Sequence, residues 1–164
     1  MSWSLLVSPL HTLAHNAGWD WAAGVAFAYG LPDQPPPARE LPTVRQILSA
    51  FRQANCHGVA WFRISGRNPS MDLPPCPDPP KCAEVDGLDL GEVSLQTDDE
   101  DDLQLDTRVT TIVFRKPSGR AVLAAMLALA SQAGPLLVFD DTADKLIVVS
   151  TDDDESRMAE HWPW

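Results

Sequence analysis

Carboxylates are the side chains whose number and spacing in this sequence could support the most chemistry. Residues 98–106 contain six of them and residues 140–155 contain seven, which together make 13 of the 23 in the chain. Acids concentrated in two places can draw a basic partner toward one face of a protein, and like charges held close together cost stability unless something uses them. We therefore interpret the acidic runs first as a surface for a positively charged partner.

The acidic runs are also compatible with metal binding and with purely local roles. Clustered carboxylates can bind Ca²⁺ or Mg²⁺, but neither run has the spacing of a calcium-binding loop, and consecutive acids point in different directions. Residues 152–155 lie where a helix would begin, and Asp140, Asp141 and Asp144 suit a turn. Residues 98–106 have no local role beyond that of a solvated connection between strands. The candidate partner-binding residues are Asp98, Asp99, Glu100, Asp101, Asp102, Asp106, Asp140, Asp141, Trp162 and Trp164.

The three cysteines offer little basis for a redox or metal site. Cys76 and Cys82 have a C-x5-C spacing that matches no common zinc or redox motif, and every histidine lies far from them in the sequence. Cys56 is followed by His57, but sequence neighbours rarely adopt the geometry that a nucleophile and its base require. We expect reduced cysteines, with a loop disulfide as the alternative in an oxidising setting.

The remaining candidates for catalysis or metal binding are also weak. His11 and His15 are four positions apart and on a helix could hold a metal ion, but only a short turn is expected there and no third ligand is near. We therefore expect two surface histidines. The sequence also lacks the motif of a nucleophile elbow. We predict no catalytic residue, no metal site and no cofactor, and we do not expect an enzyme.

Two helices with clear sequence patterns must support these side chains. Thr43 and Gln46 form a capping box, and an apolar stripe with helical spacing follows it: Val44, Ile47, Leu48 and Phe51. Asn55 is expected to end this helix. The second helix covers residues 119–133, with Ser118 as its cap and Gly-Pro as its stop. It is apolar nearly all round, which predicts that other elements cover it deeply.

Strands are predicted from β-branched and aromatic residues, from alternation and from continuous apolar runs. They cover residues 3–7, 58–65, 91–96 and 108–114, together with a buried hairpin of residues 136–139 and 146–149. Residues 19–29 are compatible with a helix or a strand, and we favour a strand over residues 24–29. A short helix is expected within residues 151–161. Trp61, in the second strand, is expected in the core.

The order of these elements predicts a single α+β domain that spans residues 1–164. Two main helices pack on a mostly antiparallel sheet in a split βαβ (ferredoxin-like) arrangement, followed by the C-terminal hairpin and short helix. Proline clusters predict loops at about 31–42 and 66–82, and an acidic loop is expected at about 97–106. A composition of 45% hydrophobic and 21% charged residues is typical of a globular protein.

The formal net charge of −11 narrows the class of partner. Nucleic acids and anionic membranes repel a surface of this sign, so we expect neither and favour a basic protein. The start of the sequence lacks the features of a signal peptide, and no apolar run has the length of a membrane span, which predicts a cytoplasmic protein. Trp162 and Trp164 either pack onto the domain or serve as contact anchors. The sequence does not distinguish a monomer from a homodimer.

The C-terminal half resembles small cytoplasmic immunity proteins of bacterial polymorphic and contact-delivered toxin systems. The resemblance covers roughly residues 107–150 and is one of layout: a strand, the helix from Arg120 to Ala133, Gly-Pro, and a hairpin that begins Leu-Leu-Val-Phe-Asp-Asp. Such proteins are commonly acidic α+β domains without catalytic motifs that plug the active site of a toxin. No residue of the layout is diagnostic, so no site of that family is transferred to this sequence.

Three functions are therefore considered. The first is a binding protein that neutralises a basic partner by occluding its active site, as the immunity protein of a toxin would; many such toxins act on nucleic acid and are basic. The second is an adaptor, chaperone or regulatory domain that uses the same acidic face on another partner. The third is a metal-assisted enzyme that uses the Asp clusters. We expect the first.

Overall fold

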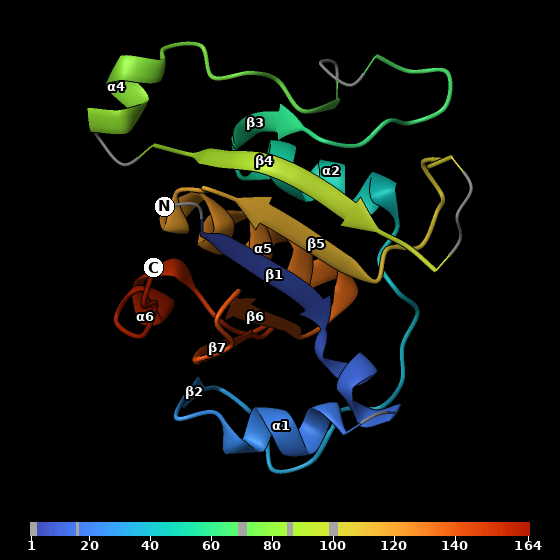
Figure 1. Ribbon diagram of the computed structural model, residues 1–164, viewed down its shortest axis with the longest axis vertical. Coiled ribbons are helices and arrows are strands. Elements are labelled where there is room, and N and C mark those ends of the chain that lie inside the picture. The colour runs from blue at the N-terminus through green and yellow to red at the C-terminus, as the bar shows by residue number, and fades with distance from the viewer. Residues whose placement is uncertain (1–2, 16, 69–71, 85–86, 99–101) are drawn as a thin grey trace.

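A mixed sheet of seven strands lies at the centre of the part of the chain that the structure describes. The computed structural model describes residues 3–15, 17–68, 72–84, 87–98 and 102–164 (Figure 1). Its strands are β1 (Ser4–Pro9), β2 (Phe27–Tyr29), β3 (His57–Ala60), β4 (Asp89–Gln96), β5 (Thr111–Arg115), β6 (Leu136–Asp140) and β7 (Lys145–Val149). Its helices are η1 (Leu10–His15), α1 (Gly18–Gly24), α2 (Val44–Gln53), α4 (Pro79–Glu84), α5 (Gly119–Ala133) and α6 (Glu155–Ala159). The predicted α+β class is therefore confirmed.

The strands follow the order β2-β7-β6-β1-β5-β4-β3 across the sheet. The central strands β6, β1, β5 and β4 pair antiparallel, with α2 between β1 and β4 along the chain and α5 between β5 and β6. This part agrees with the predicted split βαβ arrangement. The edges depart from it, because β2 pairs parallel with β7 and β3 pairs parallel with β4. The sheet is thus mixed, and the prediction of its topology is confirmed only in part.

Helices α2 and α5 lie next to each other on one face of the sheet, behind β1, β4 and β5 in Figure 1. The predicted capping box begins α2: the Thr43 hydroxyl accepts from the Gln46 amide at 3.2 Å, and the Gln46 side chain accepts from the Thr43 amide at 2.9 Å. In the core between helices and sheet, the rings of Phe51 and Phe114 meet edge to face at 6.0 Å. Helix α5 has its predicted bounds, but the Ser118 side chain makes no capping hydrogen bond to it.

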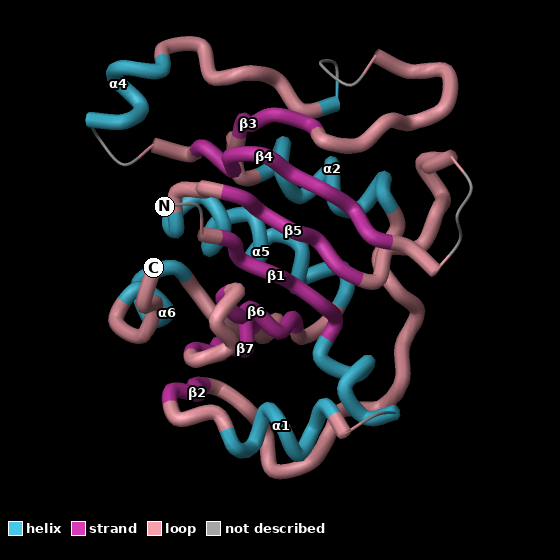
Figure 2. Tube along the Cα trace, viewed as in Figure 1, coloured by secondary structure: helices cyan, strands magenta, loops and turns pink. Residues whose placement is uncertain are grey.

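The other face of the sheet is covered only in part. There, η1 and α1 pack on β6 and β7 and bury a second apolar cluster: Leu10, Ala22, Leu137, Leu146 and Val148. Among the described residues, no helix lies in front of β1, β5 and β4 in Figure 2. Leu6 of β1 pairs with Val113 of β5, which pairs with Ser94 of β4, and all three side chains are only partly buried. An open face therefore extends from β1 to the edge strand β3.

Two predicted strands are corrected by the structure. Gly18–Gly24 form α1, and only Phe27–Tyr29 form a strand, so the strand favoured over residues 24–29 begins too early. The strand predicted for residues 58–65 is shorter, because β3 ends at Ala60. Trp61, which follows it, is 57% exposed and does not lie in the core. An edge strand has only one neighbouring strand. A side chain at such an edge, on the face of the sheet that no helix covers, is exposed to solvent.

Two short helices are absent from the prediction. In η1, His11 is buried instead of lying at the surface, while His15 is exposed; burial lowers the pKa of His11, and the positive charge of Arg39 lowers it further. Helix α4 begins with Pro79 and Pro80, which suit the first turn because amides there have no partner within the helix. Within the described ranges, no helix combines the length and apolar character that crossing a membrane requires.

Candidate functional site

Three acids of the predicted partner-binding run, Asp98, Asp102 and Asp106, are exposed on the connection between β4 and β5. Residues 99–101, which complete the predicted run, lie outside the described part of the chain. Asp106 forms an ion pair with Arg45 at the start of α2, with 3.4 Å between the charged atoms, and both side chains are exposed. Exposed pairs of this kind contribute little to stability, so these acids can still interact with a charged partner.

Asp140 and Asp141 lie at the hairpin turn between β6 and β7 and have local partners. Asp140 is 9% exposed. Its Oδ1 atom accepts from the Thr142 hydroxyl at 3.1 Å and from two amides later in the turn at 3.1 and 3.4 Å. The Asp141 carboxylate accepts from the Ser4 amide at 3.0 Å. Both carboxylates therefore hold the turn and its neighbouring strand, which is the local role that turn chemistry predicts for them.

The two acidic regions lie at opposite ends of the central strands. Near the start of β1, Leu5 pairs with Asp140, whereas further along β1, Val7 pairs with Ile112, close to where β5 leaves the acidic connection. Figure 1 shows the same separation, with the start of β1 at one end of the central strands and the end of β4 at the other. The described acids of the two regions thus do not form one surface, and the connection is the region left for a partner.

The two C-terminal tryptophans pack onto the domain. Trp162 and Trp164 contact each other edge to face, with ring centres 5.0 Å apart, and both lie against the main core. The backbone of Trp164 approaches Gly119, the first residue of α5, so closely that a Cβ atom at that position would collide with it. The structure therefore places these rings in the protein's own packing.

Exposed apolar side chains gather at the edge strand β3. Val59 and Trp61 are 55% and 57% exposed, and the Arg115 guanidinium lies 5.7 Å from the centre of the Trp61 ring. The chain after Trp61 runs beside the acidic connection, because the Ser65 amide donates to the Leu103 carbonyl at 2.9 Å. The chain that leaves the exposed apolar edge at Trp61 therefore reaches the acidic connection four residues later, at Ser65, although sequence reasoning assigned Trp61 to the core.

A second candidate site forms where a long segment returns to β3. The Gly58 amide donates to the Pro74 carbonyl at 3.0 Å, and the His57 amide donates to the Leu88 carbonyl at 3.0 Å. Both ends of the intervening segment, residues 75–87, are therefore fixed to adjacent residues of one strand. Because the segment has to leave and return at this point, its two cysteines come to lie beside the imidazole ring.

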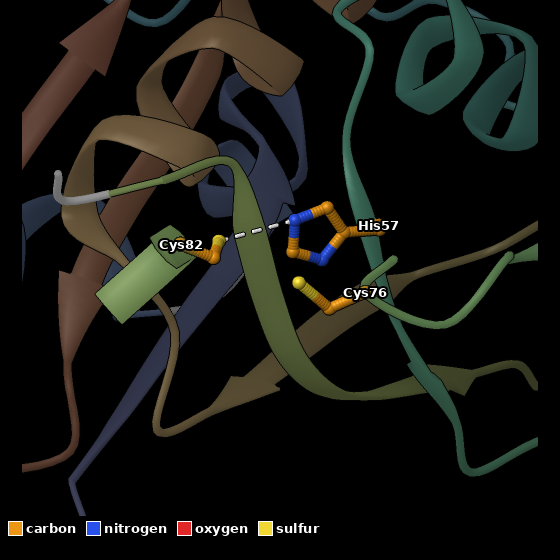
Figure 3. A group of neighbouring side chains, drawn as sticks. All are labelled: His57, Cys76 and Cys82. Carbon is orange, nitrogen blue, oxygen red and sulfur yellow. Dashed lines mark hydrogen bonds between the residues drawn. The ribbon is translucent and has the colours of Figure 1, made fainter. Parts of the chain in front are cut away.

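Figure 3 shows how His57, Cys76 and Cys82 converge, with Cys82 from α4 and Cys76 from the segment before it. The Cys82 Sγ atom lies 3.3 Å from His57 Nε2, and one potential ligand atom from each residue lies within 4.8 Å of the other two. On the other side of the ring, Nδ1 lies 3.8 Å from Oδ1 of Asp89. The three side chains border a cavity of about 310 Å³. Among the described residues, no other three such side chains gather in this way.

The surroundings of Cys82 disfavour its thiolate form. Burial raises the pKa of the Cys82 thiol, and its hydrogen bond to Cys76, the charge of Cys76 and the carboxylates of Asp89 and Asp78 raise it further. The two carboxylates place negative charge near the sulfur atom, and the Cys76 thiol would do so if it ionised. The group is therefore suited to a positively charged ligand rather than to generating a free thiolate nucleophile.

Cys56 does not belong to this group, although it precedes His57. Its thiol is buried and donates to the Ala121 carbonyl of α5 at 3.5 Å, and burial raises its pKa to about 12. Sequence reasoning missed the group because His57 and Cys82 are 25 positions apart. The one signal in the sequence was the Cys76–Cys82 pair itself. Its spacing fits no common motif, and nothing in the sequence shows that His57 lies beside it.

Comparisons of the chain with protein-family models, with curated proteins and with solved structures found no match. Two features of the molecule therefore remain, one as the basis of a proposed function and one as a separate candidate binding site. The first is the exposed edge strand β3 together with the acidic connection that the following segment contacts, and the second is the group of His57, Cys76 and Cys82.

Proposed function

We propose that this chain is a non-catalytic protein that binds and neutralises a basic protein, as the immunity protein of a bacterial toxin does, by occluding its active site. The observation that carries the proposal is that exposed Val59 and Trp61 are followed by a segment that hydrogen-bonds to the acidic β4–β5 connection, from the Ser65 amide to the Leu103 carbonyl. We name this surface the acidic edge and define it by Val59, Trp61, Asp98, Asp102 and Asp106. It offers a partner an apolar anchor at β3 and a negative field at the β4–β5 connection.

The charge of the acidic edge supports a basic partner. A protein with a net charge of −11 attracts a basic protein over several ångströms, and steering of this kind raises association rates by about 10- to 1,000-fold at low ionic strength. An enzyme that acts on nucleic acid is positive where it binds phosphate groups. An acidic protein that docks there both arrives quickly and blocks access to that surface.

The packing of Trp61 supports its role as the anchor. Tryptophan is among the residues that most often dominate the energy of an interface. The Arg115 guanidinium lies 5.7 Å from the centre of this ring, which restrains it before any partner binds. A side chain that is already ordered loses less conformational entropy on binding, so more of its contact energy contributes to affinity.

We place this activity in the cytoplasm, where a toxin that attacks nucleic acid would meet its target. An adaptor or regulatory domain would use the same acidic edge on a partner that it does not inhibit, and only an inhibition assay separates that alternative. Catalysis by clustered aspartates gains no support from the described residues, because no three of their carboxylates gather as ligands for one ion.

The test takes as the partner the product of a toxin-like reading frame next to the gene of this chain, and the absence of such a reading frame would leave the immunity function without support. Stopped-flow measurements should give an association rate that falls steeply with ionic strength. Asp98→Asn combined with Asp102→Asn should lower the rate about tenfold at low ionic strength. The matched control, Asp20→Asn with Asp33→Asn, removes the same charge from other exposed positions and should have a much smaller effect.

Trp61→Ala tests the apolar anchor of the acidic edge. It should raise the Kd about 30-fold or more, mainly through faster dissociation, because a central tryptophan commonly contributes about 2 kcal/mol or more. The unaltered chain should also inhibit the partner at a one-to-one ratio. Equal association rates for the two double variants would remove the steering role of the connection, and binding without inhibition would replace the immunity function with that of an adaptor.

A further inference from the structure

We infer that His57, Cys76 and Cys82 form a binding site for one divalent cation of the zinc class, with His57 Nε2 and the two sulfur atoms as its ligands. Thiolate and imidazole are ligands that Zn²⁺ takes in proteins, whereas Ca²⁺ and Mg²⁺ prefer oxygen. The site lies on the segment that returns to β3 and involves no residue of the acidic edge. It is therefore independent of the proposed function.

The three ligand atoms already have nearly the spacing that a metal ion requires. Around a tetrahedral Zn²⁺ with bonds of about 2.0 to 2.3 Å, neighbouring ligand atoms lie roughly 3.3 to 3.8 Å apart. His57 Nε2 and Cys82 Sγ are 3.3 Å apart, and one nitrogen of the His57 ring and the two sulfur atoms lie within 4.8 Å of one another. Cys76 lies outside any helix or strand, so a movement of about 1 Å at its thiol would complete the triangle around an ion.

Asp89 occupies the position of the outer partner of a metal-bound histidine. A histidine that ligates a metal through one nitrogen typically donates its other N–H to a carboxylate or carbonyl, which orients the ring. His57 Nδ1 lies 3.8 Å from Asp89 Oδ1, and it is buried without a hydrogen-bond partner. The Asp89 carboxylate is held in place by the Gly91 amide at 2.8 Å. A small rotation of the ring on metal binding would give the buried nitrogen its acceptor.

A nucleophilic cysteine is the main competing interpretation of this geometry. In space, Cys82 lies at one nitrogen of the His57 ring and Asp89 at the other, which is the arrangement of a catalytic triad. A nucleophilic thiol, however, needs neighbours that lower its pKa. Here two thiols and the Asp89 carboxylate, all of which are negative when ionised, lie around one imidazole ring. A divalent cation would compensate this negative charge, and it gives the second thiol a role that a triad does not.

The site also has consequences for the surrounding chain. Three protein ligands leave one position of a tetrahedral ion for water or a small ligand, and the group borders a cavity of about 310 Å³. Gly87 packs directly on Cys82: its amide donates to the Cys82 carbonyl at 2.7 Å, and a Cβ at Gly87 would collide with the sulfur. A bound ion would cross-link residues 75–87 to β3.

The experiment titrates the full chain, reduced and freed of metal by a chelator, with Co²⁺ and then Zn²⁺. Co²⁺ bound by two thiolates in a tetrahedral site gives thiolate-to-metal absorption in the near ultraviolet and strong visible bands, whereas octahedral hydrated Co²⁺ does not. The result expected is one Co²⁺ per chain and loss of the bands when Zn²⁺ displaces it. Absence of these bands at stoichiometric Co²⁺ would overturn the inference.

Variants connect the absorption to the three residues. Cys76→Ser and Cys82→Ser should each weaken Zn²⁺ binding at least about 100-fold and reduce the thiolate absorption. Asp89→Asn should weaken Zn²⁺ binding about 10- to 100-fold while the thiolate bands persist. The matched control is Cys56→Ala, which removes a thiol from the core and should leave the bands unchanged. Unaltered bands and affinity in Cys82→Ser would overturn the inference.

A second variant guards against loss of the site through misfolding. Gly87→Ala keeps all three ligands but displaces the Cys82 sulfur, so it should weaken Zn²⁺ binding while circular dichroism shows an intact fold. Full Zn²⁺ affinity in Gly87→Ala would contradict the geometry on which the site rests. A reduced chain that re-forms a Cys76–Cys82 disulfide in air and takes up no Co²⁺ would assign the thiols to redox chemistry instead.

Discussion

Replacing Asp140 by alanine should destabilise the protein, because this carboxylate holds the hairpin turn between β6 and β7. Its Oδ1 atom accepts from the Thr142 hydroxyl at 3.1 Å and from the amides of Asp144 and Lys145 at 3.1 and 3.4 Å. The residue is 9% exposed, so water can only partly replace the lost acceptor. The substitution therefore leaves backbone donors of the turn without their native partner.

The expected cost follows from these contacts. A hydrogen bond to a charged group contributes about 1.5 to 3 kcal/mol, and the contact at 3.4 Å is long and weak, so we expect a loss of about 2 kcal/mol in the free energy of unfolding. For a chain of 164 residues, each kcal/mol corresponds to roughly 2 to 4 °C in Tm. Urea denaturation should show a lower midpoint with an unchanged slope, and Tm should fall by roughly 4 to 8 °C.

Two further variants separate the acceptor from its charge. Asp140→Asn keeps an oxygen at the same place and should cost only about 1 kcal/mol. Asp141→Ala removes an exposed carboxylate that accepts from the Ser4 amide, which water can replace, so the loss should stay below about 0.5 kcal/mol. If Asp140→Ala is no more destabilising than Asp141→Ala, the reasoning is refuted, and Asp140 becomes available again as a partner-binding residue.

Three more predictions concern α2, the core and the thiols. Thr43→Ala should cost about 1 kcal/mol, and a double-mutant cycle with Gln46→Ala in urea should show coupling, because each side chain accepts from the other's amide; additive losses would contradict the capping box. Phe114→Ala should cost about 3 to 5 kcal/mol in thermal and urea unfolding, whereas Trp61→Ala should cost less than about 1 kcal/mol. Cys56 should resist alkylation in the native reduced chain, since burial raises its pKa to about 12; rapid labelling, followed by mass spectrometry, would show that the site opens.

The elements that could be predicted from the sequence are those whose signals are local. The capping box of Thr43 and Gln46 lies within one turn of helix and is found as predicted, as is the hairpin of β6 and β7. Helix α5 has its expected bounds because its apolar run and its stop at Gly134 are also local. The α+β class follows from the order of such elements. Each of these signals joins residues that are near neighbours along the chain.

The candidate site shows where local signals fail. Trp61 has the composition of a core residue, yet it is exposed, because β3 lies at the edge of the sheet and the face on which Trp61 lies is uncovered. For Trp162 and Trp164 the sequence was equally compatible with an interface and with packing onto the domain, and in the structure both lie against the core. Burial on one face or the other depends on which strands pair, and pairing joins segments that are far apart in the sequence.

By itself, the sequence determined the charge, the main helices, most of the strands and the hairpin, because net charge is a sum over residues and periodicity is a local property. Only the tertiary structure decided that the two acidic regions face different ends of the sheet, and that His57 meets Cys76 and Cys82. The convergence arises because hydrogen bonds from His57 and Gly58 hold both ends of residues 75–87. Closing such a loop depends on contacts across the fold, which no spacing along the chain encodes.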